Sequence, residues 1–350
     1  MTELSRKEFL RLLAASAGSL GSLYLAGCLN RGKSITRSLE TDKISPTPFI
    51  SRVGETEQSS PATVEPTNEV QDSPTSTPSM SHPDLVVTRN GKPEEMIIKA
   101  LLALGGMERF VKSGDIVVVK PNICTSYYGF EYAATTNPRV VGAIVKLALD
   151  AGASKVKVMD YPFGGTAEQA YNISGIKSEV EKAGGKMVVM SNLKFVETKI
   201  PDGKDLKSTR IYDDVINADV LINVPIAKNH ELALLTLAMK NLMGVIYNRP
   251  MMHANLGQRL ADLSSRVRSN LVIIDAVRML MDHGPTGGNL SDVKKADTII
   301  ASTDIIAADT YAASLFGVNP ANLTYIKKGF QMGLGTKHLD QIKIEELNLG

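Results

Sequence analysis

The sequence predicts an α/β protein with a mostly parallel, open sheet and helices on both faces. Residues 115–122 (DIVVVKPN) form an apolar run that ends in polar residues, as buried parallel strands do. Residues 137–153 (NPRVVGAIVKLALDAGA) have helical spacing, with Asn137 as the expected N-cap and Pro138 in the first turn. Strand-like and helix-like segments keep alternating beyond these two, which indicates a sheet covered by helices.

Five further segments have the composition of buried strands and are bounded by turn-forming or helical residues. They are residues 155–160, 186–190, 218–225, 270–277 and 297–302. The pattern therefore predicts a folded region over residues 85–350. Its size fits either one domain or two α/β lobes that share a cleft.

The first 27 residues have the pattern of a signal peptide. Arg6, Lys7 and Arg11 precede a short apolar stretch over residues 12–27 that is too short and too weakly apolar for a convincing membrane span. The segment SRKEFL resembles the twin-arginine export pattern, with Lys7 where the second arginine should be. The export route, for folded or for unfolded chains, stays open.

Residues 25–28 (LAGC) resemble the bacterial lipobox, and the alternative is an ordinary signal peptide with a chance cysteine. The resemblance implies cleavage before Cys28 and lipid on its sulfur. Residues 28–84 are rich in Ser, Thr and Pro and predict a disordered tether. We therefore expect an exported protein, lipid-anchored to the outer face of the cell membrane or to the periplasmic side of a membrane.

The composition excludes several classes of function. The 39 basic and 37 acidic side chains nearly balance, so the chain has no electrostatic footprint for nucleic acid. Aromatic residues make up 5% of the chain and Trp is absent, which disfavours a stacking platform for bases or sugars. Two cysteines, Cys28 and Cys124, cannot form a tetracysteine zinc site or ligate an iron–sulfur cluster.

Ligands of open α/β sheets bind beyond the carboxyl ends of the strands, so the polar residues that close the apolar runs are candidate site residues. Helix caps, turn formers and snorkelling surface lysines are the alternative interpretation. These candidates are Lys120, Asn122, Asp160, Asn223, Lys228 and Asp275. We expect Lys120, Asn122 and Lys228 to bind an anionic cofactor or substrate.

Lys240 lies in residues 235–243, an apolar stretch with helical spacing and no polar face. A buried ammonium is costly unless an anion meets it. One hypothesis makes Lys240 a catalytic or ligand-binding residue. The other pairs it with a buried carboxylate such as Asp275, with Asp309 as a further acidic candidate.

Two glycine-rich loops and three histidines complete the candidate set. Backbone amides of such loops can hold a phosphate or carboxylate, although a tight turn also explains them. The loop candidates are Gly164, Gly165 and Thr166, the last as an N-cap, together with Gly287 and Gly288. His230 and His253 are candidate catalytic residues, and His230, His253 and His283 are candidate ligands of a divalent metal. Cys124 is a buried apolar residue, a thiol ligand or a nucleophile.

The folded region resembles the bacterial and archaeal DUF362 family, a domain of unknown function. The resemblance extends over about residues 85–340 and is carried by VVVKPNIC, TTNPRVVGAIVKLALDAGASKVKVMD, VLINVPIAKNHELALLTLAMKNLMG, MHANLGQRLADL, LVIIDAVRMLMDHGPTGG and TIIASTDIIAADTYAASLFG. Some family members carry added ferredoxin-like cysteine clusters. This chain has none, so the resemblance implies no iron–sulfur cluster.

A more distant similarity is to the nickel-pincer lactate racemase family. That family has a His, a Lys ten residues later and then another His, and here His230, Lys240 and His253 follow this order. In that family the lysine carries a pyridinium-derived nucleotide cofactor and histidines ligate nickel. Its acidic-Thr-Arg segment is not recognisable in this chain.

These observations favour a membrane-tethered, extracytoplasmic enzyme that binds a small anionic ligand. The expected chemistry is isomerisation or redox chemistry on a small hydroxy or carbonyl compound, with a divalent metal or a phosphate-bearing cofactor. The first alternative is a lipoprotein that binds a solute or metal without catalysis. The second is a scaffold protein in which Lys240 belongs to a structural ion pair.

Overall fold

A computed structural model describes residues 82–350 of the chain. The predicted signal peptide, Cys28 and the tether up to residue 81 lie outside these described residues. The first strand, β1 (Leu85–Arg89), begins three residues after the start of the described range. Within that range, no helix is both long enough and apolar enough to cross a lipid bilayer.

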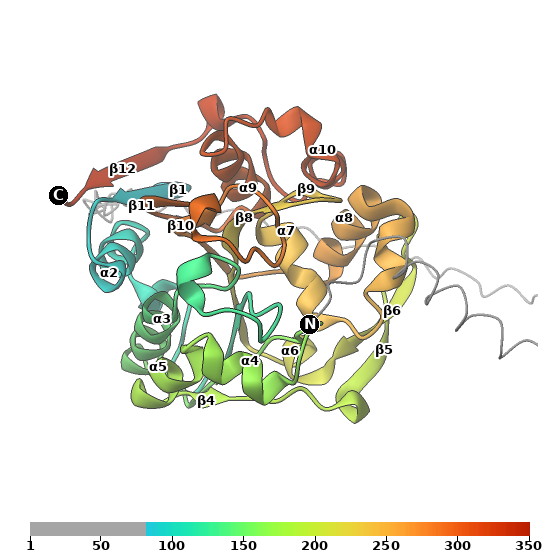
Figure 1. The fold of residues 1–350 in the computed structure, drawn as a ribbon, viewed down its shortest axis with the longest axis horizontal. Coiled ribbons are helices and arrows are strands. Elements are labelled where there is room, and N and C mark those ends of the chain that lie inside the picture. The colour runs from blue at the N-terminus through green and yellow to red at the C-terminus, as the bar shows by residue number, and fades with distance from the viewer. Residues whose placement is uncertain (1–81) are drawn as a thin grey trace, which may run out of the picture. The chain divides into compact units, whose positions relative to one another are not determined.

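The centre of the fold is a ten-stranded sheet in the order β12-β1-β11-β10-β7-β2-β3-β4, with β8 beside β10 and β9 beside β8 (Figure 1). Its other strands are β2 (Ile116–Pro121), β3 (Lys155–Val158), β4 (Lys186–Met187), β7 (Val220–Val224), β8 (Ile226–His230), β9 (Leu234–Thr236), β10 (Leu271–Leu280), β11 (Val293–Ser302) and β12 (Ile344–Asn348). All pairings in it are parallel except β1–β11, β10–β11 and β8–β9. The predicted mostly parallel α/β sheet is confirmed.

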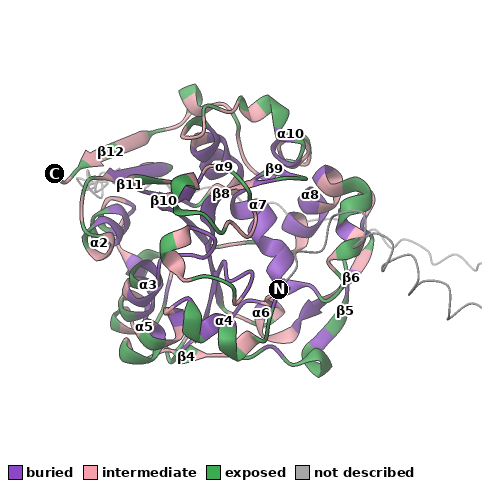
Figure 2. Ribbon diagram, in the orientation of Figure 1, coloured by how far each residue is buried: buried purple, intermediate pink, exposed green. Residues whose placement is uncertain are grey.

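Helices cover both faces of the sheet because side chains alternate along each buried strand. In β2, Val117 and Val119 pack with one layer of helices, whereas Val118 packs with the opposite layer. The first layer consists of α2 (Pro93–Ala103), α3 (Pro138–Asp150), α4 (Ala167–Ile173) and α5 (Ile176–Lys182). The opposite layer consists of α6 (Asp213–Ile216), α7 (Ala238–Asn241), α8 (Leu256–Arg266), α9 (Ile305–Ser314) and α10 (Thr324–Gln331). The central strands β2, β7 and β10 are almost entirely buried between the layers, whereas the edge strand β12 is intermediate or exposed (Figure 2).

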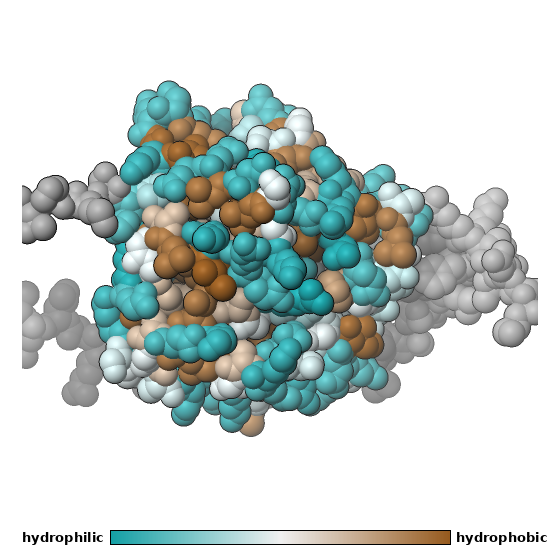
Figure 3. All heavy atoms as spheres, turned by 90° about the vertical axis from the view of Figure 1, so that its left-hand side faces the viewer, coloured by the Kyte–Doolittle hydropathy of each residue, from teal (hydrophilic) through white to brown (hydrophobic). Residues whose placement is uncertain are grey.

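A separate hairpin of β5 (Phe195–Lys199) and β6 (Ser208–Tyr212) packs on the layer that contains α7 and α8. Residues 82–350 belong to a single compact unit rather than to two separate lobes. The face that carries α2, on the left in Figure 1, shows hydrophobic patches among hydrophilic residues (Figure 3). The exposed apolar side chains of α2 are Ile98 and Leu102.

Two predicted local features are confirmed and one is wrong. Asn137 caps α3 by accepting a hydrogen bond from the backbone of Arg139, and Thr166 caps α4. The predicted helix over residues 235–243 is instead the end of β9, then α7 and a 3₁₀ turn at Leu242–Val245. The stretch is apolar on all sides because it is buried on all sides, and such a short run does not distinguish a helix from a strand.

The short helix α7 is held against the carboxyl end of β7 by two buried side chains. The Asp309 carboxylate accepts hydrogen bonds from the backbone N–H groups of Ala238, at 2.6 Å, and Met239, at 3.0 Å. Asn223, in β7, donates from its side chain to the carbonyl of Ala238 at 2.9 Å. These contacts fix the first turn of the helix that carries Lys240.

Candidate functional site

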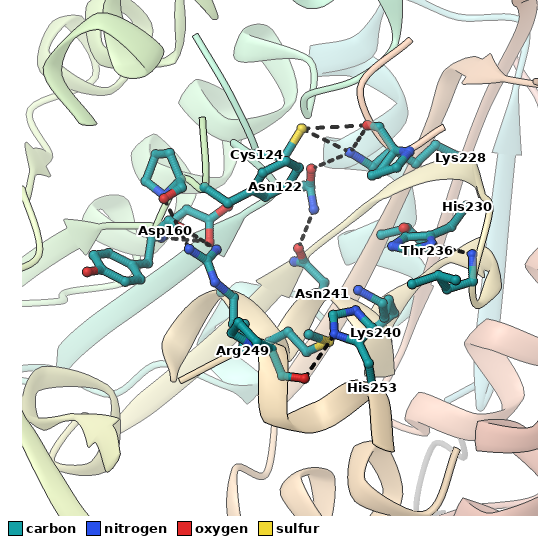
Figure 4. A pocket seen from close by; sticks show the side chains of 18 of the residues that line it. Asn122, Cys124, Asp160, Lys228, His230, Thr236, Lys240, Asn241, Arg249 and His253 are labelled. Carbon is teal, nitrogen blue, oxygen red and sulfur yellow. Dashed lines mark hydrogen bonds between the residues drawn. The ribbon is translucent and has the colours of Figure 1, made fainter. Parts of the chain in front are cut away.

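A cavity of about 900 Å³ opens where β2, β3 and β8 end, next to α7. Most of its polar walls come from these strand ends and from the loops that follow them (Figure 4). The charged and polar side chains that line it are Lys120, Asn122, Cys124, Asp160, Tyr161, Lys228, His230, Glu231, Thr236, Lys240, Asn241, Tyr247, Asn248, Arg249 and His253. The cavity is therefore rich in cations, and Asp160 and Glu231 are its carboxylates.

The innermost of these cations is neutralised by a buried ion pair. Lys120 Nζ, at the end of β2, lies 2.9 Å from the carboxylate of Asp160, which follows β3. Asp160 also accepts backbone hydrogen bonds from Ile123 and Tyr161. Gly244 packs against the pair, and a Cβ atom there would lie 1.9 Å from Asp160 Oδ1. A glycine is needed at this position because no side chain fits beside the pair.

A chain of side-chain amides connects this ion pair to the next lysine. Asn241 Oδ1 accepts hydrogen bonds from Lys120 Nζ at 2.8 Å and from the Asn122 amide at 2.9 Å. The Asn241 amide donates in turn to Asn223 Oδ1 at 2.8 Å. The oxygen of Asn122 accepts from Lys228 Nζ at 2.9 Å. Each amide thus has a defined orientation, and the network is rigid.

Lys228 is buried among neutral acceptors. Its ammonium donates to Asn122 Oδ1 and to the carbonyl oxygens of Ala134, at 2.7 Å, and Pro285, at 2.8 Å. It also lies 3.3 Å from the Cys124 sulfur. Because none of these groups is a carboxylate, the network holds Lys228 in place without cancelling its charge.

Arg249 is a second cation without a carboxylate partner among the described residues. Its guanidinium donates to the backbone carbonyls of Tyr161 and Pro162. It lies over the Tyr161 ring at 4.9 Å and near the Phe163 ring at 5.9 Å. Stacking on aromatic faces holds an arginine while leaving its charge available to a ligand.

Lys240 differs from the other cations because nothing in residues 82–350 hydrogen-bonds or ion-pairs with its amine. The residue is 9% exposed and lines the cavity. Asp275, the expected structural partner, accepts from the backbone of Asn137 at 2.6 Å and Val277 at 3.0 Å. Asp309 binds the backbone of α7 and not the ammonium. The expected structural ion pair is therefore absent from this part of the chain.

The surroundings of Lys240 favour its neutral form. Burial first, and then the positive charges of Lys228, Arg249 and Lys120, lower the pKa of Lys240 from 10.5 to about 7. The cavity thus combines two fixed cations, which form no ion pair among the described residues, with an amine whose lone pair is available near neutral pH.

His230 faces the cavity as a hydrogen-bond donor. Its Nδ1 accepts from the backbone N–H groups of Leu232, at 3.1 Å, and Ala233, at 3.4 Å. Burial and the charge of Lys240 lower the pKa of His230 to about 3, so the ring is neutral. A neutral ring that accepts at Nδ1 carries its proton at Nε2.

His253 has the opposite tautomer. Its Nδ1 lies 3.2 Å from the carbonyl oxygen of Pro250, which can only accept, so Nδ1 carries a proton, and in the neutral ring Nε2 is an acceptor. Figure 4 shows Lys240 between His253 on one side and His230 with Thr236 on the other. A donor and an acceptor therefore flank the amine.

The residues present do not fit the three-histidine metal site that the sequence suggested. His283 lies outside the cavity, where its Nδ1 pairs with Asp292 at 2.8 Å. The lone pair of His230 Nδ1 is already used by backbone amides. Over residues 82–350, no group of three or more His, Cys, Asp or Glu side chains could hold a metal ion.

The two glycine-rich loops, residues 164–166 and 287–288, contribute only Gly165 to the lining of the cavity. Gly165 lines the cavity, whereas Thr166 is occupied as the N-cap of α4 by its hydrogen bond with Gln169. Gly164 packs against Tyr127 and Thr125 and is not among the lining residues. Gly287 and Gly288 also lie outside the lining, and both have positive φ angles, of 64° and 129°. They are turn formers here.

Among the residues of the site that sequence reasoning missed are Thr236, Asn241 and Arg249. Asn241 follows Lys240 directly, and a second polar side chain in an apolar stretch was a usable signal. Arg249 lies in a loop where an arginine has no distinctive pattern. The Thr236 hydroxyl is buried without a hydrogen-bond partner within the described region, which only the structure reveals.

The fold and the site define an α/β protein with a cation-lined cavity at the carboxyl ends of its parallel strands. The chain belongs to the family described as "Domain of unknown function (DUF362)", whose profile matches residues 117–314. A protein of Synechocystis sp. named as thylakoid-associated is 27% identical over 241 residues, which are 66% of this chain and 72% of that protein.

Two solved structures have weaker similarity. The lactate racemase apoprotein from Thermoanaerobacterium thermosaccharolyticum has a TM-score of 0.43 and 12% identity over 66% of this chain. The matched region spans 56% of that racemase chain. A protein from Thermotoga maritima has a TM-score of 0.35 and 12% identity, over 65% of this chain and 60% of its own.

The buried ion pair gives a stability prediction. Asp160→Asn leaves the Lys120 ammonium buried without a counter-charge, so the free energy of unfolding should fall by about 3 kcal/mol. Asp150→Asn is the matched control, because Asp150 pairs with Lys146 on an exposed helix surface and should cost less than about 1 kcal/mol. Urea denaturation measures both. Equal effects of the two substitutions would contradict a central role for the Lys120–Asp160 pair.

Lys240 gives a pH-dependent prediction. Between pH about 7 and about 10, the unfolded chain binds a proton at Lys240 that the folded chain does not, so rising pH stabilises the fold. The stability of the wild type relative to Lys240→Met should therefore increase by roughly 1 kcal/mol per pH unit over this range. The exposed Lys99→Met variant should show no such slope. A Lys240→Met difference independent of pH would show that Lys240 is protonated in the folded chain.

Proposed function

We propose that this protein is an enzyme that binds a small anionic hydroxy or carbonyl compound in the cation-lined cavity. The observation that supports it most is the excess of cations in one cavity. Lys228 and Arg249 are held by neutral groups and have no carboxylate partner among residues 82–350. Charges that are fixed and uncompensated before a ligand arrives favour an anion without further reorganisation.

The anionic group of the ligand is a carboxylate or a phosphate. An arginine presents paired donors that match either group, and a lysine binds either one as a point charge. A cavity of about 900 Å³ has room for a small acid, or for a larger molecule that carries one phosphate. A phosphate-bearing cofactor and a small acidic substrate thus share the anionic group that these cations would bind.

Catalysis, rather than capture alone, is supported by groups that anion binding does not need. The Lys240 amine, the His230 Nε2–H donor and the His253 Nε2 acceptor all line the same cavity. Together they can move a proton at a hydroxyl or carbonyl carbon next to the anionic group. A solute-binding protein predicts reversible binding with no chemical change of the ligand.

Calorimetric titration of the full chain with phosphate, pyruvate and lactate tests this proposal. At least one of these anions should bind, and uncharged pyruvamide should bind more weakly than pyruvate. Arg249→Gln should weaken anion binding about ten-fold, because it removes a charged hydrogen-bond donor. Lys99→Met, which removes an exposed lysine elsewhere, should leave binding unchanged. Absence of binding to all three anions, or equal binding of pyruvamide, would contradict an anion site.

The proposal includes export and attachment to a membrane surface. It is supported by the basic and apolar pattern of residues 1–27 and by the LAGC segment that ends at Cys28. The relative from Synechocystis sp. is named for its association with thylakoids.

Labelling with a radioactive fatty acid in the native host tests the lipid anchor. Wild-type protein should incorporate the label and sediment with membranes, whereas Cys28→Ala should incorporate none and should be released from them. The Cys124→Ala variant should keep the label, since Cys124 lies in the folded region. Label that persists in Cys28→Ala would contradict lipidation at this residue.

A further inference from the structure

We propose that Lys240 forms an imine with the carbonyl carbon of an anionic carbonyl compound, for which a 2-oxo acid is the simplest class. This inference rests on the proposed function of the same cavity. It assigns Lys240 as the covalent nucleophile and leaves the other cations as binding groups. Three features of the structure carry it.

The first feature is that the Lys240 amine is accessible from the cavity and has no partner. The residue is 9% exposed, and no group among residues 82–350 hydrogen-bonds or ion-pairs with its nitrogen. Lys120 and Lys228, in contrast, each donate to three oxygen atoms of the protein. Of these three lysines, Lys240 alone has a nitrogen that is free to bond to a ligand.

The second feature is the rigid attachment of Lys240 to the fold. It lies on α7, whose first turn is fixed by Asp309 and by Asn223. The next residue, Asn241, is locked into the amide network of Lys120 and Asn122. The backbone on both sides of Lys240 is therefore held by buried hydrogen bonds, so a bound carbonyl would meet the amine in a defined place.

The third feature is the pair of histidine tautomers beside the amine. His253 Nε2 can accept a proton from the attacking nitrogen, and His230 Nε2–H can donate a hydrogen bond to the carbonyl oxygen. The Thr236 hydroxyl lines the same part of the cavity and has no hydrogen-bond partner within the described residues. A polar ligand next to Lys240 would satisfy this group.

The reaction is balanced without an oxidant or a reductant. The lone pair of the Lys240 nitrogen attacks the carbonyl carbon, and the C=O π electrons move to oxygen. The Lys240 nitrogen loses two protons by way of His253, and the carbonyl oxygen gains two protons and so becomes water. A carbinolamine forms first; its C–O bond then breaks, water leaves and the C=N bond forms. The carboxylate of the ligand stays near Lys228 and Arg249, which both line the cavity.

The charges that face Lys240 support attack at neutral pH. The groups that line its cavity and are charged or titratable are Lys120, Lys228, Arg249, His230, His253, Cys124, Asp160, Glu231, Tyr161 and Tyr247. Asp160 is paired with Lys120, and Glu231 is exposed. Burial, followed by the neighbouring cations, lowers the pKa of Lys240 to about 7. Exposed lysines stay protonated at this pH and react slowly.

Reductive trapping tests the inference. The full chain would be incubated with glyoxylate, pyruvate or 2-oxoglutarate and sodium cyanoborohydride, followed by intact mass and peptide mapping. At least one acid should give a single adduct on Lys240. Its yield should fall about ten-fold or more in Lys240→Met, which keeps the packing of the stem but removes the nucleophile. Lys99→Met should trap as well as the wild type.

A second measurement keeps the test independent of how well the variant folds. The rate of trapping in the wild type should rise with pH and level off just above pH 7, where Lys240 loses its proton. A rate that rises steadily toward pH 10, or adducts spread over exposed lysines, would overturn the assignment. Binding of 2-oxo acids without any Lys240 adduct would overturn the imine and leave the anion site standing. Absence of both binding and adducts would overturn the two proposals together.

Discussion

The buried ion pair between Lys120 and Asp160 is the interaction on which the site depends. It joins the ends of two neighbouring parallel strands, β2 and β3, and both partners are almost fully buried. An ammonium and a carboxylate are costly to bury, so the pair is favourable only with the further hydrogen bonds that surround it. Asn241 supplies one of these and thereby ties α7 to the sheet. Loss of either charge would disturb the helix that carries Lys240.

From this pair outward, the polar groups of the cavity divide into two kinds. Asn122, Asn241, Lys120 and Lys228 satisfy one another or the backbone, and form a fixed wall. Lys240 and the hydroxyl of Thr236 have no partner within residues 82–350. Unsatisfied buried polar groups are costly to a folded protein, and a polar ligand in the cavity would satisfy these two. The first group is the structural part of the site, and Lys240 and Thr236 are the part that would contact a ligand.

The sheet could be predicted from the sequence because its signals are local. Apolar runs that end in polar residues located β2, β7 and β10, and an Asn-Pro pair located the start of α3. The same rule identified Lys120, Asn122 and Lys228, since strand ends of a parallel sheet meet at one edge. The antiparallel pairing of β11 with both β1 and β10 left no such signal, because strand order is set by contacts distant in sequence.

The partners of the charged residues could not be predicted. Asp275 and Asp309 had the composition of counter-ions for Lys240, but both carboxylates accept hydrogen bonds from backbone amides at the starts of helices or within a strand. Sequence spacing does not show which donor a buried carboxylate meets. Nor could spacing show that His283 faces Asp292 rather than His230. The claim that the Lys240 amine is unpaired in a cationic cavity is tested most directly by a pH titration of its Nζ signal in nitrogen NMR. The signal would be assigned by its loss in Lys240→Arg. A midpoint near pH 7 would agree with an unpaired amine in a cationic cavity, and a midpoint at or above the ordinary 10.5 would contradict it.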